Sequence, residues 1–237
     1  MDILPVPKKR VATVESLMQA TRTVYVARFR NREPGTMEFH AGQYGSFILG
    51  PQTRRTFSFS TSPTHTTSFE IAADITPMGP GSVWLMHLKT GESIEFLGPL
   101  GRFIMDYQSP RKPLLVATGT GIAPFRSMLY EYLAKEKQKE ITLYWGLRHE
   151  EDVFWHEEFS SLGRTHPNFK YILTLSQPKE PWSSYKGRVT DHIYGHHESL
   201  SEYDFYLCGN RVMIHEVQEE LLSRDVPENQ IKTELFF

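Results

Sequence analysis

The sequence predicts a two-domain protein, with an antiparallel β-barrel followed by an α/β Rossmann-like domain built on a parallel sheet. Short runs rich in Val, Ile, Thr, Tyr and Phe fill the first half, and Gly, Pro and Asn punctuate them. A polar segment with two prolines follows at 107–113. Beyond it, apolar runs alternate with segments of helical periodicity, the pattern of a doubly wound sheet. We therefore expect domains at residues 1–108 and 109–237.

The strand-like runs of the first domain share the β-branched and aromatic composition of half-buried strands. They lie at 10–17, 22–30, 44–49, 56–61, 69–75 and 93–96. Several short strands at such spacing predict a closed barrel. We expect one helix to interrupt it at 82–88, with Ser82 as the N-cap.

The second domain has continuous apolar runs of the kind found in strands that are covered on both faces. Its expected strands lie at 114–118, 141–145, 171–175, 204–208 and 231–236. Residues at helical spacing predict helices over 125–133, 156–162 and 213–221.

Composition narrows the classes of function. The chain has 237 residues, of which 39% are hydrophobic and 23% charged, as in ordinary soluble proteins. Its net charge of −2 does not favour a nucleic-acid or membrane partner. The one cysteine, Cys208, permits no intramolecular disulfide and no Cys-rich metal or iron–sulfur site. No signal-peptide core or membrane-spanning run is evident. We expect a cytoplasmic protein without a metal site.

A glycine turn marks the start of the second domain. The segment 116–125, VATGTGIAPF, leaves a strand, turns on Gly119 and Gly121, and enters a helix with Pro124 near its first position. Such a junction directs backbone N–H groups and the positive end of a helix dipole towards an anion, and the glycines allow close approach. A pyrophosphate would fit. The same residues also suit an ordinary βα turn.

Two further segments have polar residues in unusual places. In 54–61, RRTFSFST, arginines stand beside alternating aromatic and hydroxyl residues. A guanidinium can bind a diphosphate with two hydrogen bonds. The segment 78–82, MGPGS, leads into the predicted helix and could form a second anion site. Read alone, the first is better explained as a barrel strand with Phe57 and Phe59 in the core, and the second as an ordinary serine N-cap.

Together and in this order, these segments resemble the ferredoxin–NADP reductase superfamily in its compact bacterial form, without a fused iron–sulfur domain. The resemblance covers about residues 11–237. The motifs that carry it are Arg55-Thr56-Phe57-Ser58, Gly79 with Gly81 and Ser82, Gly98–Phe103, Gly119–Pro124, Tyr144 with Gly146 and Arg148, Cys208-Gly209-Asn210, and Glu234 with Phe236.

The resemblance implies FAD in the barrel and NADH or NADPH on the second domain. It implies catalytic roles for Ser58, Cys208 and Glu234. Flavin contacts are implied for Arg55, Thr56, Phe57, Ser58, Gly79, Gly81 and Ser82, with Phe236 or Phe237 covering one ring face. Nicotinamide-nucleotide contacts are implied for Thr118, Gly119, Thr120, Gly121, Pro124, Arg148, Ser176, Arg188, Cys208, Gly209 and Asn210.

The implied activity is hydride transfer between NAD(P)H and flavin N5, coupled to a one-electron carrier such as ferredoxin, flavodoxin or an oxygenase component. A free-flavin reductase is the alternative within the same fold. A non-catalytic regulatory subunit is a third reading, although those usually have a Cys-rich cluster site. An acidic carrier would require a basic rim, for which the sequence offers Lys8, Lys9, Arg10, Arg54, Arg55, Arg102, Arg111 and Lys112.

The chain departs from the family pattern at two positions. Phe57 stands where tyrosine is usual, so one hydroxyl contact to the flavin is missing. Gln177 follows Ser176 where phosphate-selective members often have arginine, and a neutral amide cannot balance a 2′-phosphate. Arg148 and Arg188 could do so, and the choice between NADH and NADPH stays open.

Overall fold

The computed structural model describes residues 4–195 and 199–235. The chain divides into two compact units, which we describe separately. The first unit contains the described residues up to Met105 together with Ala123–Tyr132, and the second contains Asp106–Ile122 and the chain from Leu133 onward. The domain boundary that we predict after residue 108 stays a prediction.

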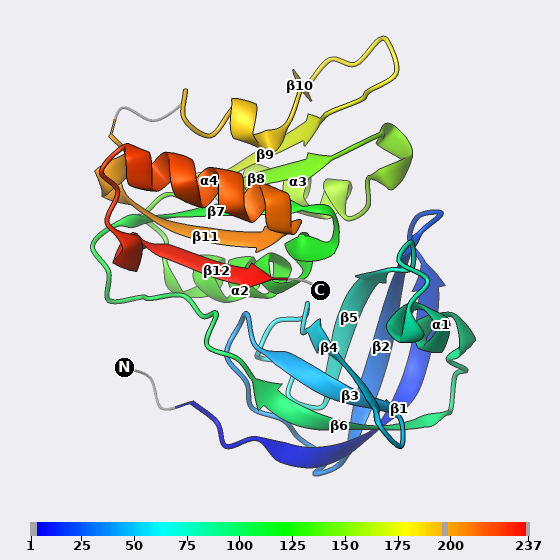
Figure 1. Cartoon of the computed structure of the whole chain (residues 1–237). Helices are drawn as coiled ribbons and strands as arrows, with labels where there is room; N and C mark the ends of the chain where they lie inside the picture. The colour runs from blue at the N-terminus through cyan, green and yellow to red at the C-terminus, as the bar shows by residue number, and fades with distance from the viewer. Residues whose placement is uncertain (1–3, 196–198, 236–237) are drawn as a thin grey trace. The chain divides into compact units, whose positions relative to one another are not determined.

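The first unit is built on a six-stranded antiparallel sheet (Figure 1). Its strands are β1 (Lys8–Gln19), β2 (Val24–Glu33), β3 (Tyr44–Gly50), β4 (Thr53–Ser58), β5 (Ser68–Asp74) and β6 (Ser93–Leu100). They follow the order β4-β3-β6-β1-β2-β5. The two edge strands are joined just beyond the end of β4, where the Ser60 N–H donates to the Glu70 carbonyl at 2.9 Å. The sheet therefore curves as in part of a barrel, and its two edge strands meet only at this point among the described residues.

Phenylalanines fill the interior of this sheet. Phe29, Phe47, Phe69 and Phe96 lie on four different strands and are fully buried. Their rings contact one another, with centroids 5.1 Å apart for Phe29 and Phe69 and 5.2 Å for Phe47 and Phe96. Each buried aromatic ring removes a large apolar area from water, so this cluster supplies much of the stability of the unit.

Helix α1 (Pro80–His87) interrupts the sheet two residues earlier than predicted. Gly79, not Ser82, is the N-cap, and Ser82 is buried in the first turn. Pro80 explains the difference, because its fixed φ and missing N–H suit the first helical position. The helix places Trp84 over the sheet, where it stacks on Phe57 with centroids 5.8 Å apart.

The second unit is built on a six-stranded parallel sheet with the order β10-β9-β8-β7-β11-β12. Its strands are β7 (Lys112–Thr118), β8 (Ile141–Leu147), β9 (Phe169–Leu175), β10 (Tyr185–Lys186), β11 (Tyr203–Gly209) and β12 (Ile231–Leu235). The helices are α2 (Ile122–Lys135), α3 (His156–Thr165) and α4 (Arg211–Ser223). The antiparallel and parallel sheets confirm the predicted fold class. The two-residue strand β10 was not predicted.

Successive residues of β8 show that both faces of the parallel sheet are covered. Tyr144 belongs to the core cluster that contains Met213, Val217 and Leu221 of α4. The next residue, Trp145, points to the other face and packs on Phe159 of α3, with ring centroids 5.9 Å apart. Figure 1 shows α4 lying along the sheet. None of the helices within the described residues is long and apolar enough to cross a membrane.

Candidate functional site

The segment from Arg55 to Ser58 ends β4, the edge strand of the antiparallel sheet. Arg55 and Thr56 are exposed, Phe57 is half-buried and Ser58 is buried. Within the described residues, the Arg55 guanidinium donates one hydrogen bond, to the neighbouring Arg54 carbonyl at 2.7 Å. The guanidinium is therefore available for a ligand outside the strand.

The start of α1 lies directly against this segment. A Cβ added to Gly81 would lie 3.2 Å from Cγ of Arg55 and 3.4 Å from Cζ of Phe57, so a larger residue would push both side chains away. Two motifs that are distant in the sequence thus meet in the structure. A Cβ at Gly79 would meet no atom within 4 Å, so the space before the helix is open.

This arrangement suits a pyrophosphate. The N–H groups of Gly81 and Ser82 precede the first helical hydrogen bond, which Val83 makes to the Gly79 carbonyl at 3.0 Å. Two N–H groups, a helix dipole and the Arg55 guanidinium together favour a doubly charged anion. The residues present therefore fit the phosphates of a flavin dinucleotide.

Phe57 has protein partners that the sequence did not reveal. Its ring stacks on Trp84, and it meets Phe47 edge-on with centroids 5.5 Å apart. Trp84 is thus a residue of this site that we did not predict, although its place two residues after Ser82 is a usable signal. The flavin contacts assigned to Phe57 and Thr56 stay predictions.

The glycine turn of the second unit joins β7 to α2 through a 3₁₀ turn, η1 (Gly119–Gly121). Gly119 has a φ of +54°, which favours glycine, and a Cβ there would meet no atom within 4 Å. Helix α2 begins at Ile122, so Pro124 is its third residue rather than its first. The missing N–H still falls within the first turn of α2.

Contacts within the protein require glycine at positions 121 and 209, and the ligand contacts predicted for these two residues stay predictions. A Cβ at Gly121 would lie 2.3 Å from the Cys208 carbonyl oxygen, and one at Gly209 would lie 2.5 Å from the Thr118 carbonyl oxygen. Close approach at these positions is between the turns after β7 and β11, which are neighbouring strands. A Cβ at Gly119 would meet no atom within 4 Å, so Gly119 has the most open surroundings of these three glycines.

Hydrogen bonds hold the two turns together. The Asn210 N–H donates to Oγ1 of Thr118 at 2.8 Å, and the Asn210 side chain caps α4 by accepting from the Val212 N–H at 2.8 Å. Trp145 Nε1 donates to the Gly119 carbonyl at 3.0 Å. The structure therefore brings together Thr118, Gly119, Gly121, Cys208, Gly209 and Asn210, which the sequence placed in two distant motifs.

Cys208 and Glu234 lie side by side on β11 and β12. Cys208 is fully buried, and burial, with a smaller effect of Glu234, raises the pKa of its thiol well above the usual value. A neutral buried thiol is a poor nucleophile. Glu234 is partly buried, and desolvation raises the pKa of its carboxyl from 4.5 to about 7. This pair therefore offers one group that can hold or release a proton near neutral pH.

The ends of β8 and β9 carry the residues predicted to distinguish the two nicotinamide nucleotides. The Gln177 N–H donates to the Arg148 carbonyl at 2.9 Å, and this bond extends the sheet by one residue beyond Ser176. Arg148 is exposed, and its guanidinium has no ion pair within the described residues. Arg188 is paired with Glu216 of α4 at 3.6 Å. Arg148 is thus the more available cation for a phosphate.

Phe236 and Phe237, one of which was predicted to cover the flavin, lie outside the described residues.

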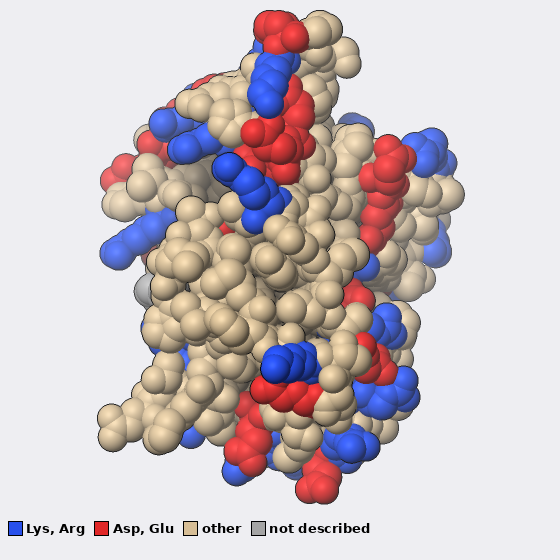
Figure 2. Space-filling view, turned by 90° about the vertical axis from the view of Figure 1, so that its right-hand side faces the viewer, with Lys and Arg blue, Asp and Glu red and all other residues tan. Residues whose placement is uncertain are grey.

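The basic rim expected for an acidic carrier is only partly available. The Arg10 side chain is buried and donates to the Gly98 and Thr36 carbonyls at 3.0 and 2.9 Å. Three more of the eight cations have carboxylate partners, in the ion pairs Lys9–Glu95, Arg111–Asp204 and Lys112–Glu202. On the face drawn in Figure 2, basic and acidic side chains are interspersed rather than segregated by sign.

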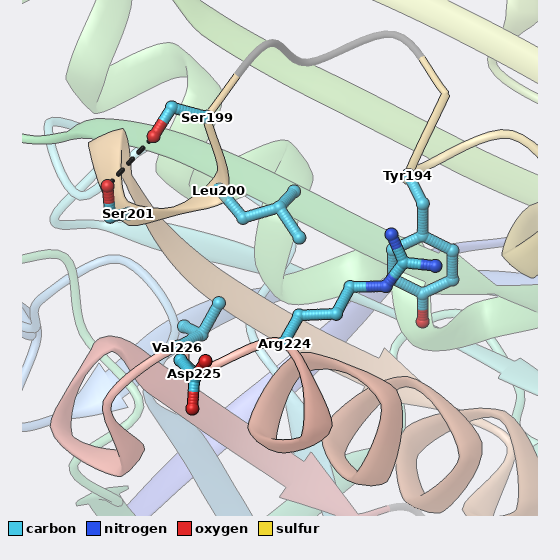
Figure 3. A pocket seen from close by; sticks show the side chains of 7 residues that line it. All are labelled: Tyr194, Ser199, Leu200, Ser201, Arg224, Asp225 and Val226. Atoms are coloured by element: carbon cyan, nitrogen blue, oxygen red, sulfur yellow. Dashed lines mark hydrogen bonds between the residues drawn. The ribbon is translucent and has the colours of Figure 1, made fainter.

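A shallow pocket in the second unit does not coincide with the predicted site (Figure 3). Its lining includes Ser199–Ser201, which precede β11, and Arg224–Val226, which follow α4. Arg224 lies over the Tyr194 ring, 4.8 Å from its centroid. These segments belong to the amino-terminal edge of the sheet. Ligands of open α/β sheets bind at the carboxyl-terminal edge, where the glycine turn lies.

Comparison with known proteins agrees with these geometries. Residues 115–219 match the family model described as the oxidoreductase NAD-binding domain. Ferredoxin--NADP reductase B of Sorangium cellulosum is 34% identical over 158 residues, which cover 65% of each chain. These matches support the ferredoxin–NADP reductase superfamily, which is the family that the sequence predicts.

Two other proteins match over nearly the whole chain. The reductase component of propane 2-monooxygenase from Mycolicibacterium smegmatis is 28% identical over 95% of this chain and 67% of its own. The cytochrome P450 reductase GcoB of Amycolatopsis superposes with a TM-score of 0.91 and 25% identity, over 99% of this chain and 71% of its own. The chain spans about two thirds of the length of the curated relatives that it matches.

Proposed function

We propose that this chain is a flavin-dependent oxidoreductase that moves electrons between NAD(P)H and a one-electron protein carrier. The observation that carries the proposal is the meeting of Arg55, Gly81 and the open start of α1, which suits the pyrophosphate of FAD. The glycine turn after β7, within the matched NAD-binding domain, suits the nicotinamide nucleotide.

FAD, when bound, accepts a hydride and releases electrons singly. The protein would supply binding and orientation. Arg55 and the N–H groups of Gly81 and Ser82 would bind the two phosphates. The Ser58 hydroxyl, at the buried end of β4, would hydrogen-bond the ring, and Phe57 would pack along it.

The second unit would bind NADH or NADPH at the carboxyl-terminal edge of its sheet. Thr118, Gly119 and Thr120 would surround the pyrophosphate, and Asn210 would fix the turn from the side. Arg148 would contact the distal ribose or its phosphate. Glu234 would hold a proton near neutral pH, since burial raises its pKa to about 7. Cys208, which is buried and neutral, would shape the nicotinamide site rather than react.

The carrier would be a ferredoxin, a flavodoxin or an oxygenase component. Lys8, Arg54 and Arg102 would supply the contacts to an acidic partner, because the other cations of the expected rim are buried or paired, apart from Arg55, which we assign to the flavin. We also propose a cytoplasmic location, which the single free cysteine supports.

Anaerobic stopped-flow reduction of the purified protein tests the central claim. We expect a yellow protein with one FAD per chain, whose flavin absorbance is bleached by NADH or by NADPH. A colourless protein that reduces added riboflavin would identify a free-flavin reductase instead. A protein that binds no flavin, or whose flavin neither nucleotide bleaches, would refute the proposal. Replacement of Arg55 by Gln should weaken FAD binding by roughly 1.5–3 kcal/mol, the range for a charge-assisted hydrogen bond.

A further inference from the structure

The backbone that follows Ser58 is held by an unusual set of contacts. Strand β4 ends at Ser58, and both following residues, Phe59 and Ser60, are fully buried. The Phe59 N–H donates to the Gln43 carbonyl at 3.0 Å, and the Ser60 N–H to the Glu70 carbonyl at 2.9 Å. The Ser60 carbonyl lies in the same buried stretch, and it needs a donor because burying it unpaired is costly.

Arg126 supplies that donor. Its Nη1 donates to the Ser60 carbonyl at 3.2 Å and to Oε2 of Glu70 at 2.8 Å. Only 14% of the Arg126 side chain and 17% of the Glu70 side chain are exposed. The cation thus joins the strand end at Ser60 to the neighbouring strand β5 through one nitrogen. Arg126 lies in α2, directly after the segment that opens the second domain in the sequence, and it belongs to the first compact unit.

We infer that Arg126 is a positioning residue for the flavin segment, which fixes the backbone at Ser60 and thereby the place of the Ser58 hydroxyl. This inference rests on the proposed function, in which Ser58 contacts the flavin ring. Ser60 is two residues from Ser58, and no regular sheet pairing holds the chain between them. Without Arg126, the Ser60 carbonyl would lack this hydrogen-bond donor, and we expect the end of the strand to shift.

Arg28 provides a matched control. Its Nη1 pairs with Oε1 of Glu70 at 3.5 Å, but the side chain is 45% exposed, and its hydrogen bonds go to Glu15 and Ser68 rather than to the Ser60 carbonyl. Loss of Arg28 therefore removes a cation from Glu70 without freeing the strand end. Comparison of the Arg28 and Arg126 variants therefore separates two effects. One is the loss of a cation beside Glu70, and the other is the loss of the hydrogen bond to the Ser60 carbonyl.

The test uses the full-length, FAD-loaded protein. Arg126→Gln with Glu70→Gln removes both charges, so that no buried charge is left unpaired. We expect the limiting rate of flavin bleaching by NAD(P)H to fall about tenfold or more, since small misplacements near a reacting group are costly. The visible absorption and circular dichroism bands of the flavin should shift. The nucleotide concentration for half-maximal rate should change less than about twofold, because the proposed function assigns Arg126 no contact with the nucleotide.

Arg126→Lys should retain part of the rate, because one ammonium can reach Glu70 or the carbonyl but lacks the planar guanidinium. Arg28→Gln should stay within about twofold of the wild type. If the double variant is only less heat-stable, with wild-type bleaching rate and flavin spectrum, Arg126 is structural and the inference is wrong. If the double variant does not fold, Arg126→Lys decides: a wild-type rate and spectrum would overturn the inference. Wild-type protein that neither nucleotide bleaches would refute the proposed function itself.

Discussion

Glu234 gives the most direct test of the candidate site, because its carboxyl changes protonation near neutral pH. Desolvation raises its pKa from 4.5 to about 7 in the folded protein. In the unfolded chain, the carboxyl regains its ordinary pKa. Between these two values the folded state holds a proton that the unfolded state has released. The free energy of unfolding should therefore fall as the pH rises through this window, and the loss should be complete above about pH 7.

The size of the effect follows from the shift. The rise from 4.5 to about 7 corresponds to roughly 3 kcal/mol, at about 1.4 kcal/mol per pKa unit. Because the side chain is only partly buried, solvent screening reduces this to roughly 1–2 kcal/mol. Glu234→Gln keeps the shape and removes the ionisation. We expect the variant to exceed the wild type in unfolding free energy by that amount at about pH 8.

Urea unfolding at several values from about pH 5 to pH 8 measures this difference. Glu228→Gln serves as the control, because Glu228 is exposed and lies just before the same strand. The difference between wild type and Glu234→Gln should grow with pH, whereas the Glu228→Gln difference should stay flat. Parallel curves for wild type and Glu234→Gln would show that the carboxyl is not desolvated, and the proposed proton-holding role would lose its basis. In stopped-flow reduction, a pH dependence centred near 7 should appear in the wild type and vanish in Glu234→Gln.

Three further predictions concern single residues. Arg148→Ala should raise the Michaelis constant for NADPH far more than for NADH if the guanidinium binds a 2′-phosphate; equal effects in steady-state assays would exclude that role. Gly121→Ala should cost about 3 kcal/mol in urea unfolding, because its Cβ would lie 2.3 Å from a backbone oxygen, whereas Gly50→Ala, where a Cβ meets nothing within 4 Å, should cost less than about 1 kcal/mol. Phe57→Tyr should tighten FAD binding by about 1 kcal/mol if the restored hydroxyl finds a partner; a weaker complex in fluorescence titration would contradict this.

The sequence predicted the fold class because its signals are local. The hydrophobic periodicity, the Gly and Pro turn signals and the change of sequence pattern near residue 107 depend only on neighbouring residues. These local features were enough to predict both sheets. At the start of α1, a single residue accounts for the difference from the prediction. Pro80 places the start of α1 ahead of Ser82, because its fixed φ and missing N–H suit the first helical position. The meeting of β4 and β5 at Ser60, by contrast, depends on the curvature of the sheet.

In the candidate site, too, the short motifs were predictable from the sequence, whereas the contacts between distant segments were not. Motifs such as Arg55–Ser58 and Gly119–Gly121 could be recognised because they are short and contiguous. The contacts that give them physical meaning are not contiguous: Gly81 packs on Arg55, Gly121 on the Cys208 carbonyl, and Trp84 on Phe57. No spacing rule within one segment predicts which turn will lie against which.

Gly121 shows how this changes the interpretation of a motif. A glycine in a phosphate-type turn is readily assigned to the ligand, yet the atom nearest to its missing side chain belongs to the protein. The turn after β7 must lie against the turn after β11 before either can present N–H groups at the edge of the sheet. Gly121 is therefore needed for stability whether or not a ligand is bound, whereas the contact of Gly119 with the nucleotide stays a prediction. The two glycines should then separate by experiment: loss of Gly121 should lower the free energy of unfolding of the apoprotein, whereas Gly119→Ala should also weaken nucleotide binding in whatever protein remains folded.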